Sequence, residues 1–197
     1  MVEVTTRELA VTELGRAGGV AARALADNPL FKFLYGDNAL ARLLATYDQF
    51  VAFLQSSDDA QVGALLGTHV VAVAAAFPPG HCVGTMIPPE WRRFGGIGEP
   101  GSDERRQALF GTLAAHDLDE RHWHVGPVGV EPGLQGLGVG SATMRELGVR
   151  LDAVGEVAWL ETDKPENVVF YRRCGYDVVD ETMLDDLRLW FMRRGPR

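Results

Sequence analysis

The stretch from His122 to Ala142 reads HWHVGPVGVEPGLQGLGVGSA, and the rest of the chain can be interpreted around it. It passes from a short apolar strand pattern, His122 to Val130, through a proline turn into a loop with three alternating glycines. A helical pattern follows directly, from Ser141 to Ala153. Because the first turn of a helix has unpaired backbone N–H groups and partial positive charge, this join predicts an anion-binding site for a phosphorylated ligand.

Gly126-Pro127 interrupts the strand within this stretch. Proline cannot donate a ladder hydrogen bond, so strand pairing must bulge or open there. An opened strand has free N–H and C=O groups, and we expect a ligand to use them.

The length of 197 residues, with 46% apolar and 23% charged residues, predicts a soluble globular protein with one domain over residues 1–197. The net charge of -8 argues against a nucleic-acid partner and favours cationic small molecules. The two cysteines, Cys82 and Cys174, lack a CxxC spacing, so we expect no disulfide framework and a reducing cytoplasm. No signal peptide and no run of about 18 apolar residues is found, so no membrane partner is expected.

Patterns in the first half predict several elements. Alternation predicts a strand in Val2 to Leu9, and apolar spacing predicts helices in Val20 to Leu25 and Asn38 to Gln55. Ala60 to Leu66 and His69 to Phe77 read as a β-hairpin. The proline- and glycine-rich residues that follow are expected to have a local role.

The segment from Leu30 to Gly36 concentrates aromatic residues in a loop-like position. Two readings remain open for it. It is either a hydrophobic plug under the neighbouring helices or a wall of the substrate pocket, with Phe31 and Tyr35 as the candidate contacts.

The second half alternates helices and strands. Helices are expected over Asp103 to His116 and Glu166 to Cys174, and a buried strand over Val157 to Thr162. Tyr176 to Met183 and Leu187 to Arg193 are expected to be the last two strands. Their exposed edge favours a homodimer.

Three interpretations of the glycine loop compete. A P-loop is excluded because no Lys follows the glycines. A dinucleotide-binding oxidoreductase is the weaker rival, because Ser141 stands where that fingerprint needs Gly or Ala. A glycine turn with only a structural role is the third.

Gln135 to Gly140, QGLGVG, resembles the Q/R-x-x-G-x-G/A loop with which GCN5-related N-acetyltransferases (GNAT) bind acetyl-CoA. Val128 to Pro132 before it, and Leu160 to Tyr176 after it, make the resemblance specific. The latter segment is similar to the LET…N…FY…GF segment of the subgroup that contains puromycin N-acetyltransferase, and Ala26 to Phe31 is similar to its AFxxDPxF opening. The resemblance is good from Trp123 to Val179 and loose before it.

The resemblance implies a mixed, mostly antiparallel α/β sheet, flanked by helices and splayed between the strands at 122–130 and 157–162. It also implies an acetyl-CoA-binding core over about residues 122–180. The residues expected to bind acetyl-CoA are Val128, Gly129, Val130, Gln135, Gly136, Leu137, Gly138, Val139, Gly140, Ser141, Asn167 and Tyr171. Because relatives often have Lys or Arg where this chain has Leu137, pyrophosphate binding must rely on backbone N–H groups. Asn167 is expected to bind the cofactor or to cap its helix.

The implied reaction is N-acetylation of a small primary amine by direct transfer in a ternary complex. A non-catalytic acyl-CoA-binding module of the same fold is the alternative. Glu161 is the candidate base, because its apolar strand should raise its carboxyl pKa; a carboxylate that only orients backbone or water is the other reading. Tyr171 is the candidate acid for the departing thiolate, or else a core aromatic residue beside Phe170.

The acceptor site is less defined. His124 and Trp190 join Phe31 and Tyr35 as candidate acceptor contacts. His122 and His124 share a strand face, but no third ligand has a matching spacing, so we expect no metal.

Overall fold

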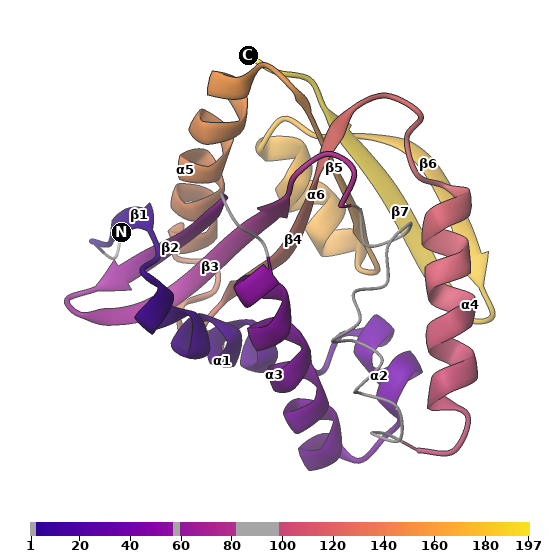
Figure 1. Ribbon diagram of the computed structural model, residues 1–197. Helices are drawn as coiled ribbons and strands as arrows, with labels where there is room; N and C mark the ends of the chain where they lie inside the picture. The colour runs from indigo at the N-terminus through magenta and orange to yellow at the C-terminus, as the bar shows by residue number, and fades with distance from the viewer. Residues whose placement is uncertain (1–2, 57–59, 82–98) are drawn as a thin grey trace.

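The computed structural model describes residues 3–56, 60–81 and 99–197, and seven strands form its central sheet (Figure 1). The strands are β1 Thr5–Glu8, β2 Gln61–Leu66, β3 His69–Phe77, β4 His122–Val130, β5 Val157–Thr162, β6 Asp177–Leu184 and β7 Leu187–Arg194. Their order is β1-β2-β3-β4-β5-β7-β6, and every neighbouring pair is antiparallel except β4 and β5. The expected mixed, mostly antiparallel sheet is confirmed.

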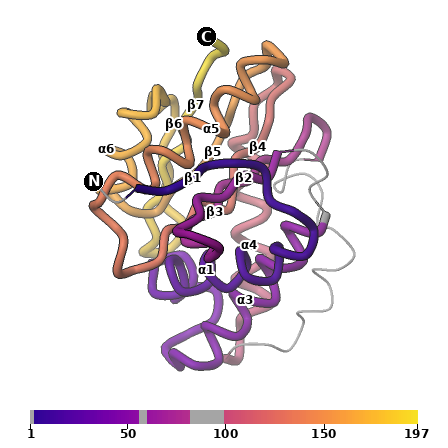
Figure 2. Tube along the Cα trace, turned by 90° about the vertical axis from the view of Figure 1, so that its left-hand side faces the viewer, coloured from indigo at the N-terminus to yellow at the C-terminus, as the bar shows by residue number. Residues whose placement is uncertain are grey.

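Helices cover both faces of this sheet, as Figures 1 and 2 show. The helices are α1 Leu14–Leu25, α2 Pro29–Tyr35, α3 Ala39–Ser56, α4 Ser102–Ala115, α5 Val139–Val154 and α6 Pro165–Arg173, with short 3-10 helices at Val11–Glu13 and Pro132–Leu134. Side chains alternate across β3: Val73 and Ala75 pack with α1 to α4, whereas Ala74 and Ala76 pack with α5 and α6. Two apolar layers therefore enclose the sheet.

The parallel pairing of β4 with β5 is short. It joins His122, Trp123 and His124 to residues 157–159, and beyond these residues the two strands diverge. Pro127 lies just past the last pair, and the β4 register against β3 also shifts there. The expected splay is confirmed, and it leaves one edge of β4 unpaired from Val125 onward.

Helix α1 begins earlier than the sequence pattern predicts. We expected a helix from Val20, but α1 starts at Leu14 and contains Gly18 and Gly19 in its interior. A Cβ on Gly18 would lie 2.5 Å from a methyl group of Val51 on α3. Glycine is therefore required for the close approach of the two helices, and the packing outweighs its low helix propensity.

The aromatic segment after Pro29 is a helix, so the loop-like assignment was wrong. Pro29 takes the first helical position and Asn28 before it is extended. Gly36 ends α2 at φ 82, a conformation that glycine adopts without strain. The side chains of Phe31 and Tyr35 are consequently fixed in direction.

A buried arginine joins the ends of α1 and α2. The Arg42 guanidinium on α3 donates to the carbonyl of Ala26 at 2.6 Å and to that of Gly36 at 2.7 Å, and it also pairs with Asp27. Ala26 and Gly36 are the C-terminal caps of the two helices, where partial negative charge favours a cation. Arg42 thereby fixes where α2 lies relative to α1.

The sequence also predicts a homodimer and a location in the cytoplasm. β6 lies at an edge of the sheet, as expected, and the homodimer inferred from it stays a prediction. Within the described residues, no helix is both long and apolar enough to cross a bilayer, and cytoplasmic location stays a prediction. Cys82 and the proline- and glycine-rich positions up to residue 98 lie outside the described residues.

Replacing Arg42 with Leu should lower the free energy of unfolding by about 3 kcal/mol, because two buried carbonyl groups lose their donor. Urea denaturation followed by circular dichroism measures the change. Arg188→Leu is the matched control, since its ion pair with Glu181 is half exposed and should contribute less than about 1 kcal/mol. Equal losses in the two variants would contradict the role given to Arg42.

Candidate active site

A cavity of about 130 Å³ opens where β4 and β5 diverge. Helices α1, α2, α3, α4 and α6 and strands β3, β4 and β5 all contribute to its walls. Seven residues that the sequence singled out line it together: Phe31, Tyr35, His124, Val128, Glu161, Asn167 and Tyr171. Phe31 and Tyr35 also belong to the buried core, so the two readings of the aromatic segment are compatible, and contact with a substrate stays a prediction.

The glycine loop lies at the N-terminus of α5, which begins at Val139, two residues before the expected start. Gly136 and Gly138 have φ values of 75 and 88, and a Cβ on either would meet no atom within 4 Å. The first helical hydrogen bond runs from the N–H of Ala142 to the carbonyl of Gly138, at 3.1 Å. The three N–H groups between them thus have no helical partner, and the space in front of the loop is open.

The unpaired edge of β4 faces the same region. The N–H of Glu131 donates to Val71 on β3, and ladder bonds alternate along an antiparallel pair, so Gly129 also bonds toward β3. Val128 and Val130 therefore direct their N–H and C=O groups away from β3, toward the side that β5 has left. A ligand chain could hydrogen-bond along this edge as an added strand would.

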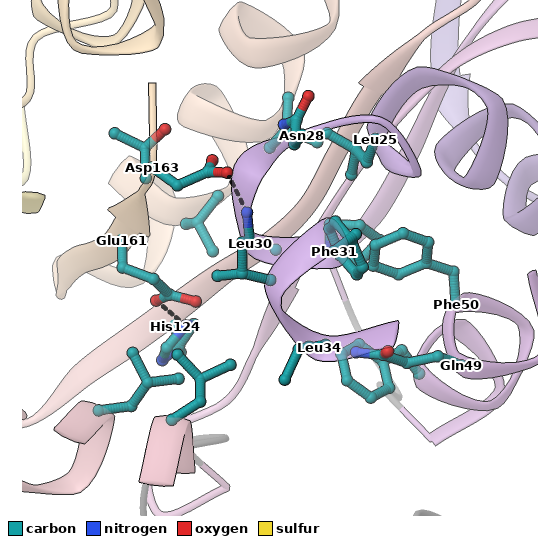
Figure 3. Close-up of a pocket in the computed structure, with 18 of the residues that line it drawn as sticks. Leu25, Asn28, Leu30, Phe31, Leu34, Gln49, Phe50, His124, Glu161 and Asp163 are labelled. Atoms are coloured by element: carbon teal, nitrogen blue, oxygen red, sulfur yellow. Dashed lines mark hydrogen bonds and ion pairs between the residues drawn. The ribbon is translucent and has the colours of Figure 1, made fainter. Parts of the chain in front are cut away.

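Glu161 and His124 meet at the base of the cavity. Nε2 of His124 lies 2.8 Å from Oε2 of Glu161, and Figure 3 shows this contact across the diverging strands. The two residues come from adjacent parallel strands, near the last paired position. A protonated Nε2 at this distance would attract the carboxylate, so His124 can hold Glu161 in place.

Asp163, directly after β5, is a site residue that sequence reasoning missed. Its Oδ2 accepts the backbone N–H of Leu30 at 2.8 Å, in the first turn of α2, where Asn28 makes no side-chain cap (Figure 3). Burial raises the pKa of the Asp163 carboxyl above its ordinary value, although the Leu30 hydrogen bond opposes the shift. A buried carboxyl in a cavity is a functional candidate, and its place just after an apolar strand was the available signal.

Tyr171 reaches the cavity from the opposite face of the sheet to Glu161. It packs in the apolar layer with Val168 and Tyr176, and burial raises the pKa of its phenol far above the ordinary value. The core and catalytic readings of Tyr171 are therefore compatible, because one ring both packs in this layer and lines the cavity.

Three predicted site residues have other contacts than expected. Lys164, not Asn167, is the N-cap of α6, and the Asn167 amide donates to Thr162 Oγ1 at 3.0 Å. The Gln135 side chain donates to the carbonyl of Val130 at 3.1 Å, so it joins the loop to β4. Trp190 is not among the described lining residues and packs under the Arg188 guanidinium, 4.9 Å from its ring centroid.

The far wall of the cavity is aromatic and includes one arginine. Phe50 of α3 and Phe110 of α4 line it, and the Arg106 guanidinium carbon lies 5.8 Å from the centroid of the Tyr35 ring. The Tyr35 hydroxyl donates to Gln49 at 2.6 Å. Sequence reasoning did not select Arg106, although its spacing from the buried Phe110 places it on the apolar face of α4.

Within the described residues, no group of three or more His, Cys, Asp and Glu side chains could hold a metal ion. The His124 ring faces the Glu161 carboxylate, and the expected absence of a metal stays a prediction.

The fold is shared with solved acetyltransferases. It resembles a histone acetyltransferase HPA2 and related acetyltransferase from Corynebacterium glutamicum, with a TM-score of 0.73, 19% identity and coverage of 98% of this chain and 97% of that one. An agmatine N-acetyltransferase matches with a TM-score of 0.69 and 18% identity, over 98% and 99% of the chains. A Drosophila melanogaster polyamine N-acetyltransferase that forms N-acetylagmatine matches with 0.68 and 17%, over 98% and 100%.

These similarities define an acetyltransferase fold, and the oxidoreductase alternative is wrong because the sheet is mostly antiparallel. Residues 95–176 match the model of the Acetyltransferase (GNAT) family, and this segment carries the glycine loop, Glu161 and Tyr171. This segment of the chain is therefore similar to the GNAT acetyltransferases, and the whole chain shares the fold of the solved acetyltransferases named above.

Replacing Gly138 with Val should weaken coenzyme A binding at least tenfold. The new side chain fills the open space before the loop and strains a backbone at φ 88. Isothermal titration calorimetry measures the affinity, and Gly133→Val is the control, because Gly133 also has open space but no positive φ. Unchanged affinity in the Gly138 variant would refute the assignment of the loop to the pyrophosphate.

Proposed function

We propose that the protein transfers an acetyl group from acetyl-CoA to the primary amine of a small molecule. The observation that carries this proposal is the cavity at the β4–β5 divergence, which brings Glu161 from one face of the sheet and Tyr171 from the other beside the unpaired edge of β4. Solved structures of the same fold include enzymes named for agmatine and polyamine acetylation. The whole chain acts as one acetyltransferase domain in this proposal.

The residues present fit acetyl-CoA, which the GNAT family uses. The open space before Gly136 and Gly138 admits a pyrophosphate close to backbone N–H groups, which compensates for the apolar Leu137, 45% exposed in the same loop. Val128 and Val130 supply hydrogen bonds for the pantetheine chain, and one of these N–H groups can serve the carbonyl oxygen. When bound, acetyl-CoA supplies a thioester carbonyl that an amine can attack.

The arrangement of the groups supports direct transfer of the acetyl group to the amine. The described residues that line the cavity include no cysteine or serine that could carry the acetyl group. The cofactor edge of β4 and the cavity meet at Val128, so an amine in the cavity can reach the thioester without an enzyme-bound intermediate.

Glu161 acts as the base in this proposal. An alkylamine has a pKa of about 10 and is mostly protonated at neutral pH, so it must lose a proton before it can attack. The Glu161 carboxylate faces the cavity and accepts that proton directly or through water, while His124 keeps it oriented.

Tyr171 holds the proton that the departing thiolate needs. Burial keeps its phenol protonated throughout the physiological range. The same apolar surroundings raise the proton affinity of the thiolate, so the two groups remain matched.

The finer family assignment is also part of this proposal. The segment from Leu160 to Tyr176, which resembles the puromycin N-acetyltransferase subgroup, forms β5, the Asp163 turn and α6. It therefore contributes Glu161, Asn167 and Tyr171 to the cavity, which supports placement in that subgroup.

Turnover with a panel of primary amines, followed by thiol release from acetyl-CoA, tests the function. Glu161→Gln should lower kcat/KM most at low pH, where the amine is most fully protonated and proton removal limits the rate. The control is Glu166→Gln, a carboxylate on the first turn of α6 that is not among the described lining residues. Coenzyme A binding without thiol release for any amine would favour the non-catalytic module.

Tyr171→Phe should reduce kcat about a hundredfold and leave acetyl-CoA affinity within about threefold, because the ring still packs while the proton is lost. Tyr176→Phe is the control, since Tyr176 is a buried neighbour, with ring centroids 5.9 Å apart, that is not among the described lining residues. A Tyr171→Phe variant with wild-type kcat would show that another group is the acid.

A further inference from the structure

We propose that the acceptor is a singly charged primary amine whose body is an apolar group about the size of one aromatic ring, and that amines with a second cationic group are excluded. This inference rests on the proposed function, because it specifies the acceptor of the same cavity.

The size of the cavity sets the size of the acceptor. Its volume of about 130 Å³ is close to that of a protein cavity of about 150 Å³, lined by apolar side chains, that binds benzene. The apolar side chains that line it include Leu30, Phe31, Leu34, Phe50, Leu109 and Phe110. One aromatic ring or a branched alkyl group would fill this space.

One end of the cavity is negatively charged. Asp163 accepts the Leu30 N–H at the N-terminal end of α2, and Glu161 lies two residues earlier, within β5 (Figure 3). Two carboxyl groups at the end of an apolar cavity select a cationic nitrogen, because the low dielectric strengthens their attraction for it. The nitrogen is thereby placed beside the proposed base.

The other end carries positive charge. Arg106 lies over Tyr35, the last residue of α2, whereas Asp163 contacts the second residue of that helix. A rise of about 1.5 Å per residue separates these two positions by roughly 7.5 Å along α2. Arg106 pairs with Asp103 at 2.6 Å, but the Asp103 side chain is 54% exposed and its charge is screened by water.

An acceptor that lies along α2 with its amine at Asp163 therefore brings its other end toward the guanidinium. An apolar end packs against the aromatic wall there, whereas a second ammonium or a guanidinium meets the like charge of Arg106 between largely apolar walls. The aromatic wall and Arg106 together thus favour an acceptor with an apolar body and a single positive charge.

A direct comparison of acceptors tests this inference. The kcat/KM values for phenethylamine and isoamylamine should each exceed those for agmatine, putrescine and spermidine by at least about tenfold, measured by thiol release. A preference for agmatine or the polyamines, or for an aminonucleoside, overturns the inference and leaves the proposed function intact. Absence of thiol release with every amine refutes the proposed function instead.

Arg106→Gln should raise kcat/KM for agmatine at least about tenfold and change that for phenethylamine less than about threefold. Arg105→Gln is the matched control, because Arg105 is the adjacent arginine, bonds to Ser102 and is not among the described lining residues. No gain for agmatine in a folded Arg106→Gln protein removes the exclusion by charge.

Asp163→Asn supplies a test that does not depend on Arg106. It should raise KM for phenethylamine about tenfold and leave KM for acetyl-CoA unchanged, since only the charge facing the amine is lost. An unchanged KM for phenethylamine overturns the placement of the nitrogen.

Thermal unfolding distinguishes an increase in KM of the Asp163→Asn variant from a folding defect. Because the pKa of Asp163 is raised in the folded state, its ionised form reduces stability as pH rises above the ordinary carboxyl range. The variant should therefore have a Tm at pH 7 at least equal to that of the wild type, with the difference shrinking toward acidic pH.

Discussion

The parallel pairing of β4 with β5 over only three residues is the constraint on which the rest of the structure depends. A sheet that stayed paired would bury the edge of β4 and close the route from one face to the other. Because the strands separate after His124, the N–H and C=O groups of Val128 and Val130 remain available, and Glu161 comes to lie at the end of a strand that faces space. The proposed cofactor contacts and the proposed acid–base groups thus depend on the same separation of the strands.

The divergence also explains how groups from the two apolar layers meet. Glu161 extends toward α1 to α4, whereas Tyr171 belongs to the layer under α5 and α6. In a continuous sheet these two side chains would be separated by the backbone. Here the gap between the strands allows both side chains to line one cavity from opposite faces of the sheet. This arrangement suits the roles of proton acceptor and proton donor that we propose for them.

Features that depend on neighbours in the chain could be predicted from the sequence. The glycine loop, the helix after it and the opening at Pro127 follow from local backbone chemistry, and the mixed sheet followed from the family resemblance. Helix α2 was missed, because its first-turn N–H is satisfied by Asp163, 133 residues away, and its end is held by Arg42. The contact of His124 with Glu161 could not be predicted either, because it depends on the register of two strands and the sequence does not show that register.

Helix α2 is held at both ends by side chains that belong to other elements. Asp163 bonds to its first turn, and Arg42 bonds to the carbonyl of Gly36 at its end, while its own inward residues, such as Phe31 and Leu34, make neither attachment. The residues of α2 that face the cavity can therefore be substituted without loss of the two hydrogen bonds that hold the helix in place. If the proposed function holds, substitutions on this face could change the preferred acceptor, in nature or by directed evolution, without changing the groups proposed for acetyl transfer.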